Sequence, residues 1–426
     1  MRELELRYPA ELVVIGVHSG KYHAERVSGR IRDASLRLGV THPIVNDRQF
    51  RIWRSYAVSA WPTLVIIDPR GSVVGSHAGE FTADMLMPFI DGLIETTRAS
   101  GELDTRLLHF ETDKPEAPPG MLRYPGKVAI DGDRIAVSDS GNHRVMYGSL
   151  SENGTRMDLH RVFGGMEAGF ADGAAPSFNS PQGLAFSGKS LYVADAANHA
   201  VRMIDLDTGE TATLAGTGRQ FRSRVDRDGG SLSSPWDLAI AGNTLFVAMA
   251  GAHQLWAIDL GSKKSRVHSG SGGEDIRDGD NREALLAQPM GIAAFGDKLC
   301  FADSESSAIR VADIAADGNV RTLVGTGLFD FGDADGIGDE VLMQHQQGVS
   351  LHSSGRMLIA DSYNDSVKWL DPMTRSAATW IGGLHEPGGV ACGGSHAYVA
   401  DTNAHRIVAI DYETGALAAL SIGKAG

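Results

Sequence analysis

Short apolar strands separated by polar turns repeat six times along the last two thirds of the chain. Each copy has an apolar stretch, a tight turn and a second apolar strand, which ends in Asp in five copies. The six strand-end residues are Asp139, Asp195, Met249, Asp303, Asp361 and Asp401. Each copy has room for about four strands, and one such sheet alone is only marginally stable. Radial packing of six sheets buries both faces of each, so the pattern predicts a six-bladed β-propeller over residues 121–426.

The start of each copy is a second marker of the repeat. The six starts are Tyr124-Pro125, Ser180-Pro181, Ser234-Pro235, Gln288-Pro289, Gln346-Gln347 and Glu386-Pro387. Met249 in place of Asp, and Gln347 in place of Pro, weaken single positions but leave the count at six. We interpret the strand-end aspartates as turn residues, because Asp side chains accept backbone N–H bonds in the turn that follows. The alternative is a ring of carboxylates that lines a functional channel.

The first hundred residues alternate strand and helix patterns. Residues 12–17 predict a buried strand, and residues 23–38 predict an amphipathic helix with one apolar face, formed by Val27, Ile31, Ala34 and Leu38. A strand that ends at Asp68, a strand over residues 72–77 and a helix over about 82–97 follow, with Thr82 as the helix N-cap. The order predicts an α/β domain over residues 1–100, followed by a linker over residues 101–120.

Composition narrows the class of protein and of partner. The 426 residues carry a net charge of -14, which disfavours nucleic acid and anionic membranes as partners. The two cysteines, Cys300 and Cys392, are too few for a disulfide framework. No apolar run approaches the roughly 18 residues of a membrane span. We therefore expect a soluble, cytoplasmic protein, and the oligomeric state stays open.

Two sets of polar residues are candidates for metal binding. His143, His199, His253 and His405 occupy the same place in four copies, but equivalent residues of packed sheets lie about 10 Å apart, too far for one zinc ion. The second set lies in loops that enter successive copies, and clustered carboxylates of this kind bind calcium. Asp-Gly is also an ordinary turn pair. These propeller-face loop residues are Asp172, Asp228, Asp278 and Asp335. We expect no metal and no cofactor, and a protein or peptide partner on the propeller face.

Both halves of the chain resemble known families. Asn142-His143-Arg144-Val145 and Asn198-His199-Ala200-Val201 resemble the signature of NHL repeats. The segments 13–22, 42–47 and 60–71 look like thioredoxin-like proteins in which such a domain precedes an NHL propeller. The resemblance places Pro62 at that family's cis-proline. It also implies that Trp61, Pro62, Thr63 and His18 flank the place of a redox thiol pair.

The chain departs from that family at one point. The family has a strand and helix with a Cys-x-x-Cys-type centre before the segment at 13–22, where this chain has about eleven residues and no cysteine. Without a thiolate there is no nucleophile for disulfide exchange. The missing strand is central in the thioredoxin sheet, so we expect unpaired strand edges there. Our hypothesis is that Met1 is an internal start or a boundary within a longer gene product.

These observations favour a noncatalytic interaction platform with a degenerate or truncated thioredoxin-like domain. A thiol-disulfide oxidoreductase whose Cys-x-x-Cys segment is missing is the alternative, and a metal-dependent propeller lyase or hydrolase is a distant third. Two modes of ring closure stay open. Blade six can take its outer strand from residues 416–422, or residues 106–111 can add a closing strand.

Overall fold

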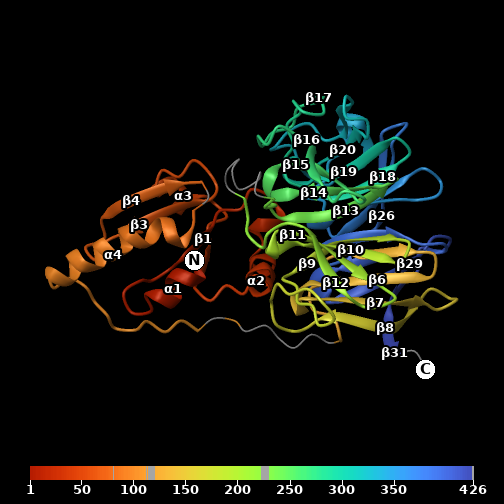
Figure 1. Cartoon of the computed structure of the whole chain (residues 1–426). Coiled ribbons are helices and arrows are strands. Elements are labelled where there is room, and N and C mark those ends of the chain that lie inside the picture. Colours follow the sequence, from red (N-terminus) through yellow and green to blue (C-terminus); the bar gives the residue numbers. More distant parts are fainter. Residues whose placement is uncertain (80, 112, 114–119, 222–229, 425–426) are drawn as a thin grey trace. The chain divides into compact units, whose positions relative to one another are not determined.

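The computed structural model describes residues 1–79, 81–111, 113, 120–221 and 230–424. The chain divides into two compact units, Met1–Ala117 and Pro118–Gly426, which are described separately (Figure 1). Within the described residues no helix has both the length and the apolar character needed to cross a membrane.

The first unit contains four α-helices and four strands in its described part. In chain order these are α1 (Arg2–Arg7), β1 (Gly16–His18), α2 (Ser28–Arg37), β2 (Ile44–Asn46), α3 (Arg51–Ser55), β3 (Thr63–Ile67), β4 (Val73–Ala78) and α4 (Ala83–Ala99), with a short 3-10 turn η1 (Ala24–Arg26). β1 pairs with β2 in parallel, and β3 pairs with β4 antiparallel, so the strands form two separate two-stranded sheets. As the sequence predicts, Thr82 caps α4, its Oγ1 accepting the Met85 N–H at 3.2 Å.

The apolar core of this unit is smaller than the pattern predicts. Its buried residues, Leu4, Tyr8, Leu86 and Ile90, join α1 to α4. The predicted strand over residues 12–17 shrinks to the three residues of β1, and only Ile31 of the predicted helical face is buried. Val27 and Leu38 of that face are 52% and 74% exposed. The reason is geometric, because a two-stranded sheet is too narrow to cover a helix face.

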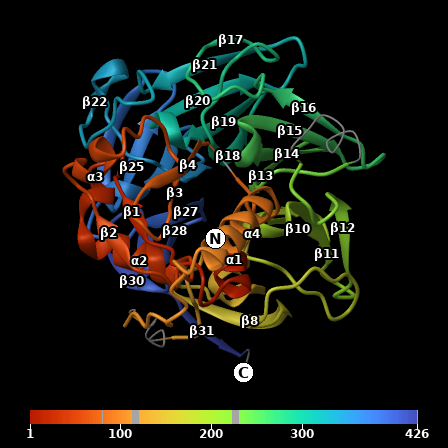
Figure 2. The same cartoon turned by 90° about the vertical axis from the view of Figure 1, so that its left-hand side faces the viewer.

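The second unit is a six-bladed propeller, whose blades follow one another around a ring (Figure 2). Blades one to three consist of β5 (Val128–Asp131), β6 (Arg134–Asp139), β7 (Arg144–Leu150) and β8 (Arg156–Gly164); β9 (Pro181–Ser187), β10 (Ser190–Asp195), β11 (Ala200–Asp205) and β12 (Thr211–Ala215); and β13 (Pro235–Ala241), β14 (Thr244–Met249), β15 (Gln254–Asp259) and β16 (Ser265–Ser269). The second strand of each of these blades ends at the predicted residue.

Blades four to six follow the same plan. They consist of β18 (Pro289–Phe295), β19 (Lys298–Asp303), β20 (Ala308–Asp313) and β21 (Asn319–Val324); β23 (Gly348–Leu351), β24 (Met357–Asp361), β25 (Ser366–Asp371) and β26 (Ser376–Ile381); and β27 (Pro387–Cys392), β28 (His396–Asp401), β29 (Arg406–Asp411) and β30 (Leu417–Ala419). Two-residue strands β17 (Gly279–Asp280) and β22 (Gly336–Ile337) extend blades four and five. A 3-10 turn follows the second strand of every blade; these turns are η2 (Ser140–Asn142), η3 (Ala196–Asn198), η4 (Ala250–Ala252), η5 (Ser304–Ser306), η7 (Ser362–Asn364) and η8 (Thr402–Ala404), and η6 (Gly338–Glu340) lies in a loop.

The hydrophobic core of the propeller lies between neighbouring blades. Phe246 and Leu255 of blade three, for example, pack with Leu286, Ile292 and Phe301 at blade four. Because each sheet is covered on both faces, its second strand is buried along its length and its sequence is a continuous apolar run.

A ring of hydrogen bonds joins each blade to the next. The four repeat histidines have left-handed backbone, with φ of 49 to 55°. The Nδ1 atoms accept backbone N–H groups of the next blade over 3.0–3.2 Å; the pairs are His143–Ser180, His199–Ser234, His253–Gln288 and His405–Tyr124. In blades four and five Ser307 Oγ and Asp365 Oδ1 take the acceptor's place, at 3.3 and 2.9 Å. These histidines are therefore inter-blade acceptors, and the metal interpretation has no support.

Blade five starts one residue earlier than the pattern predicts. The residue before Pro has positive φ in the other copies, and in blade five that residue is His345, with φ of 49°. Gln344 N–H donates to Asp361 as Asn179 N–H donates to Asp195. Gln346, not Gln347, thus stands in the place of Pro. The sequence in this copy has no proline to mark the register.

The ring is closed by a strand from the end of the chain that joins blade one. β30 completes blade six, and β31 (Ser421–Lys424) pairs in parallel with β8 at the outer edge of blade one. Of residues 106–111 the described part has no strand, so the alternative closing strand is not formed there. Thr402 Oγ1 also donates to Pro125 O at 2.9 Å across the same joint.

Ile422→Asp is expected to lower the free energy of unfolding of the propeller by about 1–2 kcal/mol, because Ile422 packs on the core shared by blades one and six. Thermal melting followed by circular dichroism measures the change. Met373→Asp is the matched control, because Met373 is 86% exposed. Equal melting temperatures for the two variants would show that β31 does not hold the ring closed.

Candidate functional site

The five strand-end aspartates are structural hubs inside the blades. Each has no exposed surface, and each accepts a backbone N–H from the segment that enters its blade, over 2.6–2.8 Å; the pairs are Asp139–Arg123, Asp195–Asn179, Asp303–Ala287, Asp361–Gln344 and Asp401–His385. The backbone donor therefore lies upstream, and not in the following turn as the sequence suggested. The turn contributes side chains instead, such as Asn198 Nδ2 to Asp195 at 2.8 Å. These carboxylates line no channel.

A cation accompanies each of these buried carboxylates. Arg144 and Arg406, at the start of the third strand, reach Asp139 and Asp401 over 2.7 and 2.8 Å in blades one and six. In blades two, four and five the cation lies two residues further along the third strand and is fully buried; these cations are Arg202, Arg310 and Lys368. None of these five cations was recognised as a candidate from the sequence.

The loop aspartates bind the same buried cations. Asp172 lies 2.6 Å from Arg202, Asp278 lies 3.0 Å from Arg310 and Asp335 lies 2.9 Å from Lys368. Each also accepts the N–H and hydroxyl of a threonine on the outer strand; these are Thr213, Thr322 and Thr379. Asp228 lies outside the described residues. Three of the four predicted loop residues are thus fully engaged, and the described residues contain no group of three His, Cys, Asp or Glu suited to a metal ion.

Blade three replaces this charged set with an apolar one. Met249 stands at the Asp position and Trp256 at the cation position, and the Trp256 ring stacks on Phe221 with ring centroids 5.9 Å apart. Carboxylate and cation are lost together. A buried charge without its partner is costly, which explains why a single replacement is not seen here.

The propeller axis is filled by one ion pair. The axial position of the repeat is Gly183, Gly291, Gly348 and Gly389 in four blades, where a Cβ would lie within 3 Å of a neighbouring atom. In blades one and three the axial residues are Lys127 and Asp237, which the sequence analysis also missed. Their departure from an otherwise constant glycine was the available signal.

Lys127 spans the axis and contacts three other blades. Its Nζ lies 3.2 Å from Asp237 Oδ2 and donates to Met290 O at 2.9 Å and to Gln347 O. Burial lowers the pKa of Lys127 and raises the pKa of Asp237, and the attraction between the two charges opposes both shifts. The axis is therefore closed at this level by a saturated polar contact.

An open apolar hollow of about 390 Å³ lies beside the outer strand of blade one. Val162 and Met166 line it, with 42% and 61% of their surface exposed, together with Pro176. Glu167 and Ser177 are its polar lining residues. A hollow with these walls suits apolar side chains of a peptide.

The predicted cis-proline loop of the first unit lies against the end of β1. The Trp61–Pro62 peptide bond is cis, and Trp61 Nε1 donates to Ser19 O at 2.8 Å, next to His18. Thr63 Oγ1 donates to Ala60 O within the loop. Trp61 also packs on Trp53, with ring centroids 4.5 Å apart. The four predicted residues of this loop are thus brought together.

Apolar side chains are exposed where the two small sheets face solvent. Val13, Ile15 and Val17 are 44–57% exposed, and Val45, paired with Val17 in the sheet, is 41% exposed. β1 has only β2 as a partner and β3 has only β4, so one edge of each is unpaired in the part of the chain that the structure describes. Unpaired edges beside apolar surface are places where a further strand can pair.

Neither cysteine has the environment of a reactive thiol. Burial raises the pKa of Cys300 to about 12, and burial also raises the pKa of Cys392. Both are unpaired with any other cysteine. They are strand residues of blades four and six.

Comparison with known proteins finds homologues of the chain and one match to a repeat family. The NHL repeat model matches residues 122–145. The chain is 36% identical over 468 residues to human NHL repeat-containing protein 2, covering 96% of this chain and 63% of that protein. It is also 36% identical to the Arabidopsis thaliana protein SUPPRESSOR OF QUENCHING 1, chloroplastic, over 97% of this chain and 42% of that one. The chain thus spans less than two thirds of the length of these curated relatives.

A solved structure supports the fold. A protein of unknown function from Bacteroides thetaiotaomicron superposes with a TM-score of 0.50 at 13% identity, over 69% of this chain and 71% of that one. The chain is thus a homologue of NHL repeat-containing protein 2, and its second unit is a six-bladed propeller.

Proposed function

We propose that the chain is a noncatalytic platform that binds a protein or peptide partner on its propeller, in the cytoplasm. The apolar hollow at Val162 and Met166 carries this proposal. The charged residues of the described propeller support the noncatalytic role. Those at the axis and in the loops form ion pairs and hydrogen bonds with one another. An exposed apolar hollow on a rigid ring needs only a complementary side chain to bind a partner.

Met166→Asp is expected to weaken binding of peptides selected against the intact chain by at least about tenfold, because a carboxylate in the hollow must lose its hydration when an apolar side chain enters. Peptide display followed by fluorescence polarisation measures the affinities. Met373→Asp is the control, because it adds the same charge at an exposed methionine of blade five, outside the hollow. Selected peptides that bind both variants equally well would exclude the hollow as the binding site.

A second function is favoured by the first unit. We propose that residues 1–100 form a thioredoxin-like domain without its first strand and redox motif, and that a longer form of the protein is a thiol-disulfide oxidoreductase. The element order from β1 to α4 supports this, as do the unpaired edges of β1 and β3 and the position of Trp61 near His18.

Insulin reduction distinguishes the two functions. The present chain is expected to show no activity above that of a Cys300→Ser/Cys392→Ser variant, because neither thiol forms a thiolate near neutral pH. Activity in a chain extended upstream by a Cys-x-x-Cys segment would establish the oxidoreductase. Activity in the present chain that the double variant abolishes would contradict the noncatalytic assignment.

A further inference from the structure

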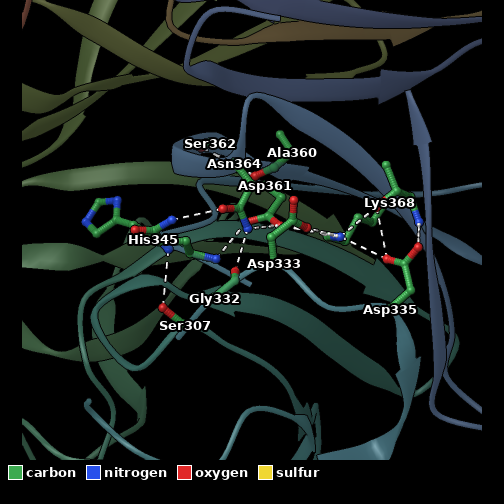
Figure 3. A network of polar contacts seen from close by, with 12 residues as sticks. Ser307, Gly332, Asp333, Asp335, His345, Ala360, Asp361, Ser362, Asn364 and Lys368 are labelled. Atoms are coloured by element: carbon green, nitrogen blue, oxygen red, sulfur yellow. Dashed lines mark hydrogen bonds and ion pairs between the residues drawn. The ribbon is translucent and has the colours of Figure 1, made fainter. Parts of the chain in front are cut away.

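Blade five holds one cation among three carboxylates (Figure 3). Lys368 Nζ donates to Asp333 Oδ1 at 2.7 Å, to Asp335 Oδ1 at 2.9 Å and to Thr379 Oγ1 at 2.7 Å. An ammonium group has three hydrogens, so these bonds use all of them. The buried carboxylate of Asp361 lies 4.0 Å from Nζ, beyond hydrogen-bond distance.

In blades two and four an arginine takes the place of the lysine, and its guanidinium pairs with both the strand-end aspartate and the loop aspartate. Arg202 reaches Asp195 at 2.9 Å and Asp172 at 2.6 Å through different nitrogens, and Arg310 reaches Asp303 and Asp278 in the same way. Lys368 has a single nitrogen, and its three hydrogens are used by Asp333, Asp335 and Thr379, so none is left for Asp361 in this arrangement.

The loop of blade five also carries one more charge. Asp333 stands two residues before Asp335, where the loop of blade two has Phe170, whose ring lies over the Arg202 guanidinium. The lysine and the additional carboxylate therefore occur together in blade five. Asp333 is 59% exposed, whereas Lys368 and Asp361 are fully buried.

Asp361 is consequently a buried carboxylate held by neutral donors. It accepts from Gln344 N–H and from Asn364 Nδ2, each at 2.8 Å. The pKa of Asp361 is raised to about 7, mainly by burial and in small part by the nearby Asp333, whereas the two hydrogen bonds and Lys368 act in the opposite direction. Lys368 itself is desolvated by burial, but Asp333 and Asp335 raise its pKa, so it stays protonated. His345, beside Gln344, pairs with Glu305.

We propose that blade five carries a proton-linked switch in which ionisation of Asp361 draws the Lys368 ammonium from Asp333 to Asp361. Asp361 gives its proton to solvent, and Lys368 keeps its charge throughout. The bond from Lys368 to Asp333 is the one that breaks, because the exposed Asp333 carboxylate can then be hydrated by water. The bond to Asp335 is kept, because Asp335 is also held in place by the Thr379 N–H at 2.9 Å. Above the transition the propeller surface presents a free carboxylate at Asp333, and below it the carboxylate is tied down. The loop backbone is anchored separately, since Asn364 Nδ2 donates to Gly332 O at 2.7 Å, and the movement of Lys368 leaves this bond intact.

Carboxyl carbon NMR of the full chain labelled at aspartate tests the switch. The wild type is expected to show a resonance that titrates near pH 7 and disappears in Asp361→Asn, together with an Asp333 resonance that changes with the same midpoint. Lys368→Arg restores the arginine pairing of blades two and four, so the Asp361 midpoint should fall below about pH 5, a change of at least about a hundredfold in acidity. Asp333→Asn, a change at an exposed side chain, should also lower the midpoint, because the lysine is then free to move.

Two NMR outcomes would overturn the switch. One is an Asp361 carboxyl that ionises below about pH 5 in the wild type, and the other is an Asp333 resonance that does not follow the Asp361 step. Thermal melting is an independent readout if the resonances overlap. A folded-state pKa above the unfolded value adds stability at low pH that is lost as pH rises toward 7. The melting temperature of the wild type should therefore fall between pH 5 and pH 8 relative to Asp333→Asn, and an identical pH dependence of the two proteins also contradicts the switch.

Discussion

Lys127→Met is expected to lower the free energy of unfolding of the propeller by about 3–5 kcal/mol. The substitution keeps most of the length of the side chain but leaves the Asp237 carboxylate at the axis without its cation, and it removes the bonds to Met290 O and Gln347 O from blades four and five. Side-chain exposure of Lys127 and Asp237 is 4% and 12%, so water cannot replace the missing partner. Thermal and urea unfolding of the propeller transition measure the loss.

A double-mutant cycle separates the ion pair from simple packing. Lys127→Met/Asp237→Asn removes both charges, and we expect the double variant to be more stable than Lys127→Met alone by at least about 1 kcal/mol. Additive losses from the two single changes would mean that the two charges do not interact at the axis.

Arg202→Met should destabilise blade two by a similar amount, about 3–5 kcal/mol. Arg202 is fully buried and pairs with Asp172 and Asp195, and its guanidinium also lies over the rings of Phe170 and Phe178. Its removal leaves the Asp195 carboxylate buried with neutral donors only. Thermal melting and amide hydrogen exchange of β10 and β11 measure the effect.

The pH dependence of this loss identifies its cause. Burial already raises the pKa of Asp195, and loss of the cation raises it further, so the folded variant binds a proton more readily than the unfolded chain does. Stability of that kind is present at low pH and lost as pH rises. The deficit of Arg202→Met should therefore shrink between pH 8 and pH 5 and be smaller in Asp195→Asn/Arg202→Met. A deficit independent of pH would assign the effect to lost packing alone.

The number of blades and the ends of their second strands could be predicted from the sequence, because a strand covered on both faces is a continuous apolar run with a polar end residue. The register of blade five could not, since His345 and Gln346 carry no proline to mark it. In the first unit, the exposure of Val27 and Leu38 depends on the width of a sheet formed by residues distant in the sequence. The apolar periodicity of one helix carries no information about that width.

The aspartates of the candidate site were visible in the sequence, but their partners were not recognised. In blades two, four and five the cation follows the aspartate by seven residues, as Arg202 follows Asp195, and Trp256 follows Met249 at the same spacing. That spacing is a usable signal, because it places the cation two residues beyond the residue that faces the aspartate on the adjacent antiparallel strand. The 4.0 Å separation of Lys368 from Asp361 could not be predicted, since it depends on which of three nearby carboxylates accept hydrogen bonds from the single ammonium group.

The joints between blades also bear on how such repeats are recognised. Each joint needs a lone pair aimed at one backbone N–H of the next blade, and imidazole, hydroxyl and carboxylate all supply it in this one chain. Mutation can exchange these three groups without breaking the hydrogen bond between the blades. A repeat can therefore lose its sequence motif and still fold as a blade of the propeller. A search that scores the acceptor and the left-handed backbone, rather than histidine itself, should count every blade.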